Sequence, residues 1–136
     1  MSEIILTLLP KYFNKIKKGE KIYEVRLKKD KYNDIKINDI IIFLKKPDLK
    51  EKIKTKVNDI ILYKSFNEMI DSLPIDLLGF KGYEKEEIIK VYKDIYPDNK
   101  EEEIYGIIVF KIFLVWIKIF IKQLIWKFKY FNKNNF

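Results

Sequence analysis

Hydrophobic residues in the first half of the chain follow the spacing of one short helix and three strands. Residues 10–18 predict the helix, with a proline at its first position and a glycine just after its last. Residues 21–27 alternate between apolar and polar side chains and predict a strand. The apolar run 40–44 predicts a strand buried on both faces, and residues 52–63 predict a long strand with a bulge at 58–59.

The second half of the chain predicts two helices and a closing strand. Ser65-Phe66-Asn67-Glu68 has the pattern of a capping box and precedes apolar residues at helical spacing. Residues 84–96 repeat that spacing after an acidic start and end at Pro97, and residues 104–113 predict the last strand. The expected fold class is α+β, a small, mostly antiparallel β-barrel whose ends are covered by short helices.

Composition limits both the size of the fold and its chemistry. A chain of 136 residues has the length of a single domain, and its 48% hydrophobic content is enough to form a hydrophobic core. It has no cysteine and no histidine, which excludes disulfides, thiolate zinc sites and nucleophiles activated by histidine. Catalysis would depend on carboxylates, lysine, tyrosine or hydroxyls, and we predict no metal and no cofactor. The N-terminus lacks the layout of a signal peptide, so we expect a cytoplasmic location.

The formal charge of +8 is concentrated at the C-terminal end. Residues 111–136 hold six lysines and no acid, whereas residues 1–110 hold 22 basic and 20 acidic side chains. The body of the protein is therefore nearly neutral. A nucleic-acid site on it has to be a local patch rather than a broad basic surface.

Arg26 is the only arginine in a chain whose other 27 basic residues are lysines. Its planar, five-donor fork matches a carboxylate or a phosphate, which a lysine ammonium does not. Glu24 shares the strand face of Arg26, so we expect a direct pair at the mouth of a groove. A structural ion pair and a ligand site both explain this pattern. Lys21 can act with them only if it precedes the regular strand or lies beside a bulge.

Several tyrosines lie among lysines, namely Tyr12, Tyr23, Tyr32 and Tyr63. Bases can stack on such rings while lysines follow the phosphate backbone. In a chain with 15% aromatic residues, however, core packing accounts for most of the rings.

The segment from Gly19 to Arg26 reads G-x-K-x-x-E-x-R and resembles the ASCH domain, a small barrel related to PUA domains and associated with RNA metabolism. Supporting segments follow in the family's order over about residues 3–113: Leu6–Leu9 before the first helix, residues 36–43, residues 65–68, Leu77-Leu78-Gly79-Phe80, Ile95-Tyr96-Pro97 and Tyr105-Gly106. Asn38 stands where the family usually has glycine, and asparagine also tolerates a positive φ.

The resemblance implies that a groove lined by Lys21, Tyr23, Glu24 and Arg26 binds RNA or a modified nucleoside. One branch of the family resembles an amidohydrolase that deacetylates N4-acetylcytidine with a lysine, a threonine and a glutamate. Lys21 matches the lysine, but Glu24 stands at the threonine position and the glutamate position falls near Lys81. Lys21 and Glu24 are therefore the candidate catalytic residues of an alternative amidohydrolase function, whose activity we expect to be weak or absent.

Residues 114–136 extend beyond the family's usual end, so we divide the chain into an ASCH-like domain (1–113) and a basic, aromatic tail. On a helix, most tail lysines share one narrow stripe, with apolar side chains around the rest. A lysine near the centre of a membrane-spanning helix costs about 2.5 to 3.5 kcal/mol of insertion free energy, so the tail lysines argue against a membrane span. We expect residues 114–131 to form an amphipathic helix that associates with a membrane surface or a protein partner, a second alternative function. The sequence does not fix the oligomeric state.

Overall fold

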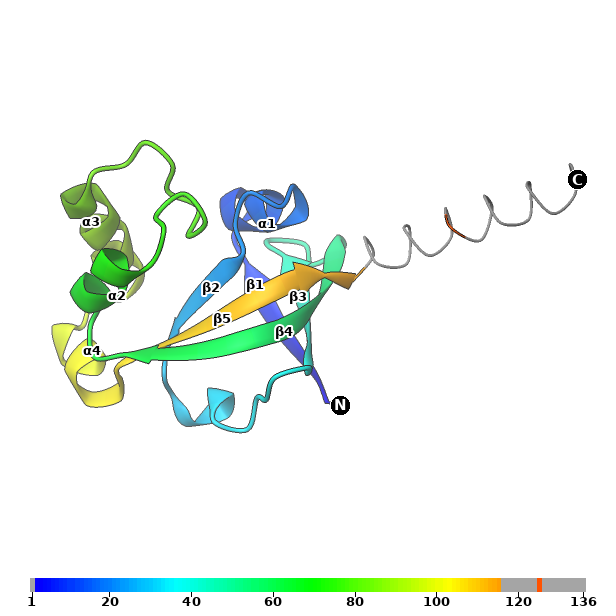
Figure 1. Cartoon of the computed structure of the whole chain (residues 1–136), viewed down its shortest axis with the longest axis horizontal. Helices are drawn as coiled ribbons and strands as arrows, with labels where there is room; N and C mark the ends of the chain where they lie inside the picture. The colour runs from blue at the N-terminus through cyan, green and yellow to red at the C-terminus, as the bar shows by residue number, and fades with distance from the viewer. Residues whose placement is uncertain (1, 116–124, 126–136) are drawn as a thin grey trace, which may run out of the picture.

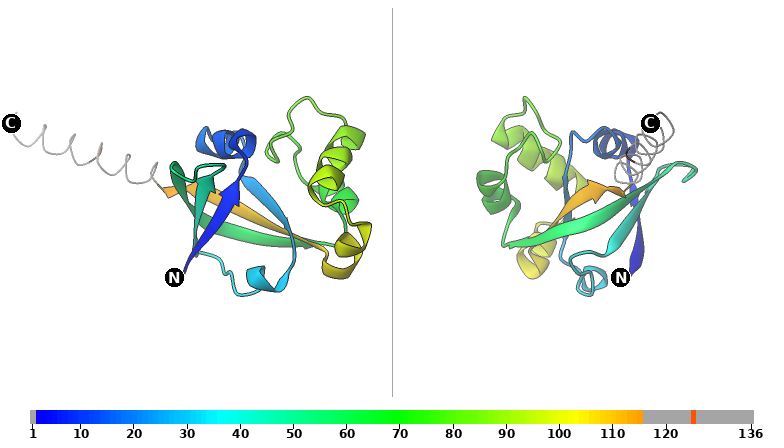
Figure 2. Two further views of the ribbon diagram at one scale, coloured as in Figure 1. Left: turned by 180° about the vertical axis from the view of Figure 1, so that it is seen from behind. Right: turned by 45° about the vertical axis from the view of Figure 1, so that its right-hand side comes forward.

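The structure is a computed structural model that describes residues 2–115 and 125. Its five strands form one curled sheet in the order β1-β3-β4-β5-β2 (Figures 1 and 2). β1 pairs with β3 in parallel, and the other three pairings are antiparallel. The strands are β1 (Glu3–Leu8), β2 (Tyr23–Leu27), β3 (Ile40–Lys45), β4 (Lys52–Tyr63) and β5 (Ile107–Leu114). The predicted α+β class and the mostly antiparallel sheet are confirmed.

Four short α-helices and one 3-10 turn accompany the sheet. They are α1 (Pro10–Lys17), the 3-10 turn η1 (Asp30–Tyr32), α2 (Phe66–Ser72), α3 (Lys85–Ile95) and α4 (Asn99–Tyr105). Figure 1 shows α1 above the sheet near β1 and β2, whereas α2, α3 and α4 group beside the end of the sheet where β4 ends and β5 begins. The helices thus cover the two ends of the curled sheet, as the sequence predicts.

The helix starts use the predicted capping chemistry, with one difference. The Ser65 hydroxyl accepts a hydrogen bond from the Glu68 backbone N–H, but the Glu68 carboxylate accepts from the N–H of Lys64 instead of Ser65. At α3, Glu84 and Glu87 complete a reciprocal capping box. Both arrangements satisfy backbone donors that the first turn of a helix leaves without partners.

Three predicted boundaries are wrong. The predicted closing strand begins too early, because Ile104 and Tyr105 end α4, which Asp98 caps by accepting from the Lys100 N–H. β5 also extends to Leu114, which is buried and pairs with Thr55, so a tail helix does not begin there. β2 begins at Tyr23 rather than at residue 21.

The bulge predicted in the long strand is confirmed. The register between β4 and β5 shifts between Val57 and Asp59, which leaves one extra residue on β4. The turn before β3 also has the predicted geometry, because Asn38 adopts φ 78°. Val57, which lies next to the bulge, is fully buried in the core inside the curled sheet.

The hydrophobic core has two parts that meet along β5. One lies inside the curl of the sheet and includes Phe13 of α1 and Phe110 of β5. The other lies between the sheet and helices α2 and α3, and includes Phe66 and Val109. Alternate residues of β5 enter opposite parts, so this strand is buried on both faces.

The predicted amphipathic helix of residues 114–131 lies almost entirely outside the described residues. Within residues 2–115 and 125, no helix is long and apolar enough to cross a membrane.

Candidate ligand-binding pocket

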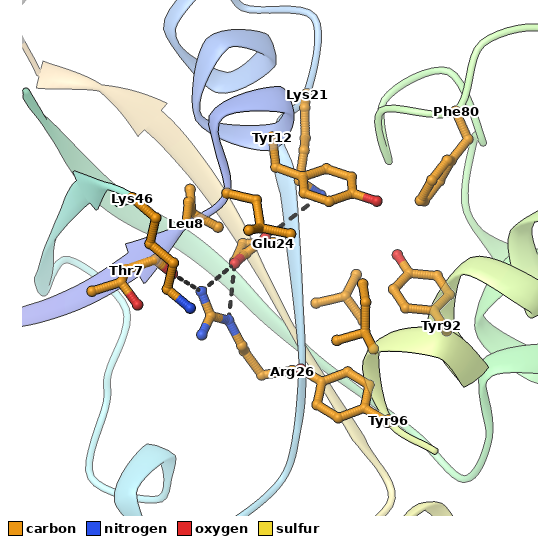
Figure 3. Close-up of a pocket in the computed structure, with 13 residues that line it drawn as sticks. Thr7, Leu8, Tyr12, Lys21, Glu24, Arg26, Lys46, Phe80, Tyr92 and Tyr96 are labelled. Atoms are coloured by element: carbon orange, nitrogen blue, oxygen red, sulfur yellow. Dashed lines mark hydrogen bonds and ion pairs between the residues drawn. The ribbon is translucent and has the colours of Figure 1, made fainter. Parts of the chain in front are cut away.

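A pocket of about 150 Å³ lies where the end of β1, the start of α1, β2 and α3 come together (Figure 3). Its walls combine charged and aromatic side chains with a few aliphatic ones. The lining residues are Thr7, Leu8, Leu9, Tyr12, Lys21, Glu24, Val25, Arg26, Lys46, Phe80, Tyr92, Ile95 and Tyr96. Three of the four predicted ligand-binding residues are among them.

Glu24 and Arg26 form the predicted direct pair. Arg26 Nε and Nη2 donate to Glu24 Oε2 at 2.9 and 2.7 Å, and Nη2 also donates to the Thr7 carbonyl at 3.0 Å. The last bond joins β2 to β1, which are the two edge strands of the curled sheet. Burial has the largest single effect on Arg26 and opposes its charge, but Glu24, together with Tyr32 and Tyr96, raises the pKa of the guanidinium above its ordinary value.

Lys21 approaches the other oxygen of Glu24. Its Nζ lies 3.6 Å from Glu24 Oε1, and it donates to the carbonyls of Tyr23 and, at 3.0 Å, Leu78. In a regular strand Lys21 would point away from Glu24. It can approach Glu24 because it lies before the first residue of β2. Its side chain is 3% exposed, and burial lowers the pKa of its ammonium although Glu24 opposes that shift.

A short loop brings an aromatic wall to this charged cluster. Lys15 donates to the Gly79 carbonyl at 2.5 Å, and Lys21 holds the neighbouring Leu78 carbonyl. Gly79 has φ +95°, and a Cβ there would lie 3.2 Å from Lys21 Cδ. Two lysines thus fix the loop and place Phe80 at the edge of the pocket.

The aromatic wall consists of rings that support one another. Phe80 packs edge-on against Tyr12 and Tyr92, with ring centroids 6.2 and 5.6 Å apart. Tyr92 stacks on Phe66 at 4.6 Å. Figure 3 shows the hydroxyls of Tyr12 and Tyr92 directed toward the same part of the pocket. Burial raises the pKa of both phenols, so each remains protonated and able to donate at neutral pH.

Most residues of the aromatic wall were not among the predicted site residues. Tyr92 and Tyr96 belong to a predicted helix, and packing of that helix is enough to account for both tyrosines. Only the tertiary structure shows that their rings lie in the same pocket as Glu24. Tyr23, which was predicted to bind ligand, does not line the pocket. Its ring belongs to the core between the sheet and α2 and α3, because alternation turns it away from Glu24.

The position near Lys81, where the resemblance places the glutamate, also lies outside the pocket. Lys81 and the acids nearest to it in the chain, Asp76 and Glu84, are exposed and do not line the pocket. Among the described residues that line it, Glu24 is the only acid. The pocket therefore joins one carboxylate and three cations to an aromatic wall.

Comparisons with known proteins agree with this fold. The hypothetical protein PH0355 has a crystal structure that is 35% identical, with a TM-score of 0.73 over 84% of this chain and 99% of that one. Protein PF0455 from Pyrococcus furiosus is 31% identical, with a TM-score of 0.61 over 82% and 96% of the two chains. The ASCH protein from Zymomonas mobilis shares the fold at 16% identity and a TM-score of 0.57, over 82% and 67%.

No curated protein gives a significant match to this chain. The family model of the ASCH domain, however, matches residues 6–115, a span that contains all five strands except the first residues of β1. This match, together with the two solved structures that are more than 30% identical, shows that the chain belongs to the ASCH domain family.

Proposed function

We propose that the pocket binds the base of a nucleoside, either free or as an unpaired nucleotide of RNA. The observation that carries this proposal is the meeting of an ion-paired Glu24 and Arg26 with the rings of Tyr12, Phe80 and Tyr92 in one small pocket. Aromatic side chains are the usual neighbours of an unstacked base, and polar side chains read its hydrogen-bonding edge.

The polar groups suit the edge of a base. Among the described residues, Glu24 Oε1 has one polar contact, with Lys21 Nζ at 3.6 Å, so it can accept a hydrogen bond from an exocyclic amine. The phenols of Tyr12 and Tyr92 can donate to a ring nitrogen or a carbonyl oxygen. Because the carboxylate and the two donors border the same small pocket, a base that carries both donor and acceptor atoms matches them.

The size of the pocket restricts the ligand further. Its volume of about 150 Å³ is below the range of roughly 300 to 1,000 Å³ of sites that take drug-sized ligands. One planar ring fits such a space, and an attached sugar has to remain outside. This arrangement suits recognition of single bases, as in proteins that bind unpaired RNA.

Membership of the ASCH family supports the same proposal, since the family is associated with RNA metabolism and is related to PUA domains. The nearly neutral body of the protein agrees with a local site rather than a long basic groove.

The test is a titration of the isotopically labelled full chain, followed by NMR, with cytidine, N4-acetylcytidine, uridine, adenosine and a short unpaired RNA. We expect shifts of the amides at Tyr12, Glu24 and Tyr92. Tyr92→Phe removes one hydroxyl from the wall and should weaken binding about tenfold, which is the effect of one hydrogen bond.

Tyr105→Phe is the matched control, because Tyr105 lies on α4 and does not line the pocket. It should leave affinity unchanged. Shifts confined to other surfaces, or equal affinities of the two variants and the unmodified chain, would contradict the proposal.

A further inference from the structure

The charges around the pocket do not balance. Glu24 is shared by Lys21 and Arg26, and Lys46 is a third cation on the lining. If Glu24 and Lys21 are counted as neutralising each other, Arg26 and Lys46 remain as two positive charges without an acid of their own. A pocket with this balance favours an anionic ligand.

Arg26 keeps part of its fork free. Nε and Nη2 are used by Glu24 and Thr7, whereas Nη1 has no hydrogen-bond partner among residues 2–115 and 125. The side chain is only 16% exposed, yet no buried donor without a partner occurs in that part of the chain. Nη1 therefore retains some exposure, and because Arg26 lines the pocket, its two N–H groups can donate to a ligand there.

Lys46 lies beside this free donor. Its backbone N–H donates to the Leu8 carbonyl at 2.8 Å, which fixes the residue at the pocket end of β1. The ion pairs of the described residues leave Lys46 without an acid. Figure 3 shows its amine directed toward the Arg26 guanidinium, with the Thr7 hydroxyl on the same side.

We propose that Arg26, Lys46 and Thr7 form a phosphate subsite at the edge of the pocket, so that the preferred ligand is a nucleotide rather than a nucleoside. The nucleotide part of this inference rests on the base binding proposed above. Two neighbouring cations repel each other when no anion is present, and an anion between them removes that cost.

The chemistry favours phosphate among anions. A phosphate monoester carries about −1.5 to −2 charges at neutral pH, which matches two cations. A guanidinium N–H edge, an ammonium and a hydroxyl can bind three different phosphate oxygens. The oxygens can belong to a monophosphate or to a phosphodiester of RNA, because both present the same acceptors.

The experiment compares cytidine, cytidine 5′-monophosphate and 3′-monophosphate, and a dinucleotide without terminal phosphate, all at one ionic strength. The best phosphate-bearing ligand should bind about tenfold more tightly than cytidine. A preference for a monophosphate indicates a free nucleotide, and a preference for the dinucleotide indicates RNA. Inorganic phosphate alone should shift the amides of Thr7, Arg26 and Lys46.

Lys46→Gln should remove this advantage, lowering the affinity for the best phosphate-bearing ligand about tenfold and the affinity for cytidine much less. Lys50→Gln is the matched control, because it removes the same charge from the same exposed segment but does not line the pocket. Circular dichroism checks that both variants fold. Equal affinities for cytidine and all phosphate-bearing ligands, or equal losses in the two variants, would overturn the subsite.

The two proposals fail differently. If neither cytidine nor its nucleotides bind while inorganic phosphate still shifts Arg26 and Lys46, base binding is wrong and the anion subsite stands. If cytidine binds and phosphate adds nothing, the subsite is wrong and base binding stands.

Discussion

At the scale of single residues, Arg26 shows why one arginine persists in a lysine-rich chain. Two of its nitrogens donate hydrogen bonds to Glu24 and to the backbone of β1, and these bonds stabilise the fold. The third nitrogen has no hydrogen-bond partner among the residues that the structure describes. The structural and ligand-binding interpretations of the sequence are therefore compatible, because different atoms of one fork serve them.

Arg26→Lys should destabilise the protein even though it keeps the charge. An ammonium cannot bond Glu24 and the Thr7 carbonyl with the same planar geometry, so we expect a loss of about 1 to 2 kcal/mol. Urea unfolding measures it. Lys29→Arg, at an exposed pair with Glu101, is the control and should change stability by less than about 0.5 kcal/mol. Unchanged stability of Arg26→Lys would show that the fork is not needed by the fold.

Tyr96 should contribute to the dependence of stability on alkaline pH. Burial raises the pKa of Tyr96 to about 12, above its ordinary value of 10.0. A group whose folded pKa is raised gives stability that is complete below pH 10 and is lost as pH rises through 12. The stability difference between the unmodified chain and Tyr96→Phe should thus shrink from pH 9 to pH 12, as measured by urea unfolding. A constant difference would mean that Tyr96 has an ordinary pKa.

Deacetylation of N4-acetylcytidine should be weak or absent. Glu24 Oε2 is occupied by Arg26, and no second acid lines the pocket among the described residues. A missing general base costs about 10²- to 10⁴-fold in rate. Chromatography of released cytidine measures the activity. Robust turnover would contradict this expectation; Lys21→Ala and Glu24→Ala should then each reduce it strongly, and activity in both variants would place the chemistry elsewhere.

At the scale of elements, the loop from Leu77 to Phe80 couples α1 to the aromatic wall. Its carbonyls accept from Lys15 and Lys21, and its glycine leaves room for the Lys21 stem. The element has no regular secondary structure. Its position depends on these two lysine side chains and on the backbone N–H groups of Ile22 and Tyr23, which donate to the Leu77 carbonyl.

Gly79→Ala should therefore be more damaging than an ordinary glycine substitution. A positive φ costs an alanine about 1 to 2 kcal/mol, and the Cβ would also lie 3.2 Å from Lys21 Cδ. Gly82→Ala is the matched control, because it has φ +83° and no atom within 4 Å of the added Cβ. Urea unfolding should show a larger loss for Gly79→Ala, and equal losses would mean that Lys21 moves aside freely.

At the scale of the whole molecule, the core closes within the region that matches the family. Every described core residue lies between Leu6 and Leu114, and Leu114 itself is only 8% exposed. Strand β5 thus extends one residue beyond the predicted domain boundary at residue 113. Side chains, rather than backbone pairing, connect the two edge strands across the curl.

A chain that ends at Val115 should remain folded, with a free energy of unfolding within about 0.5 kcal/mol of the full chain. We also propose that residues 114–131 mediate association, in which case this shorter chain should be more soluble, monomeric and unable to bind anionic vesicles. Size-exclusion chromatography and vesicle co-sedimentation test the second part. Unfolding of the shorter chain would show that the tail belongs to the core.

Several secondary-structure elements could be predicted from the sequence because their signals are local. Apolar spacing located the long strand β4 and helix α3, a proline and a glycine marked the ends of α1, and a capping pattern marked the start of α2. The pairing of Glu24 with Arg26 was also predictable, since two residues on one strand face are neighbours in any fold. Such features depend only on residues close together in the chain.

The residues that surround the Glu24–Arg26 pair could not be predicted from the sequence, because they come together only in the tertiary structure. Lys46, Phe80, Tyr92 and Tyr96 are between 20 and 72 residues distant from Glu24 or Arg26 in the chain, and no spacing rule brings them together. α4 was missed because its acidic segment has no apolar face, and it forms where caps and neighbouring strands hold it. The sequence determined which charges can pair along one strand, whereas the curl of the sheet decided which distant side chains close a pocket around them.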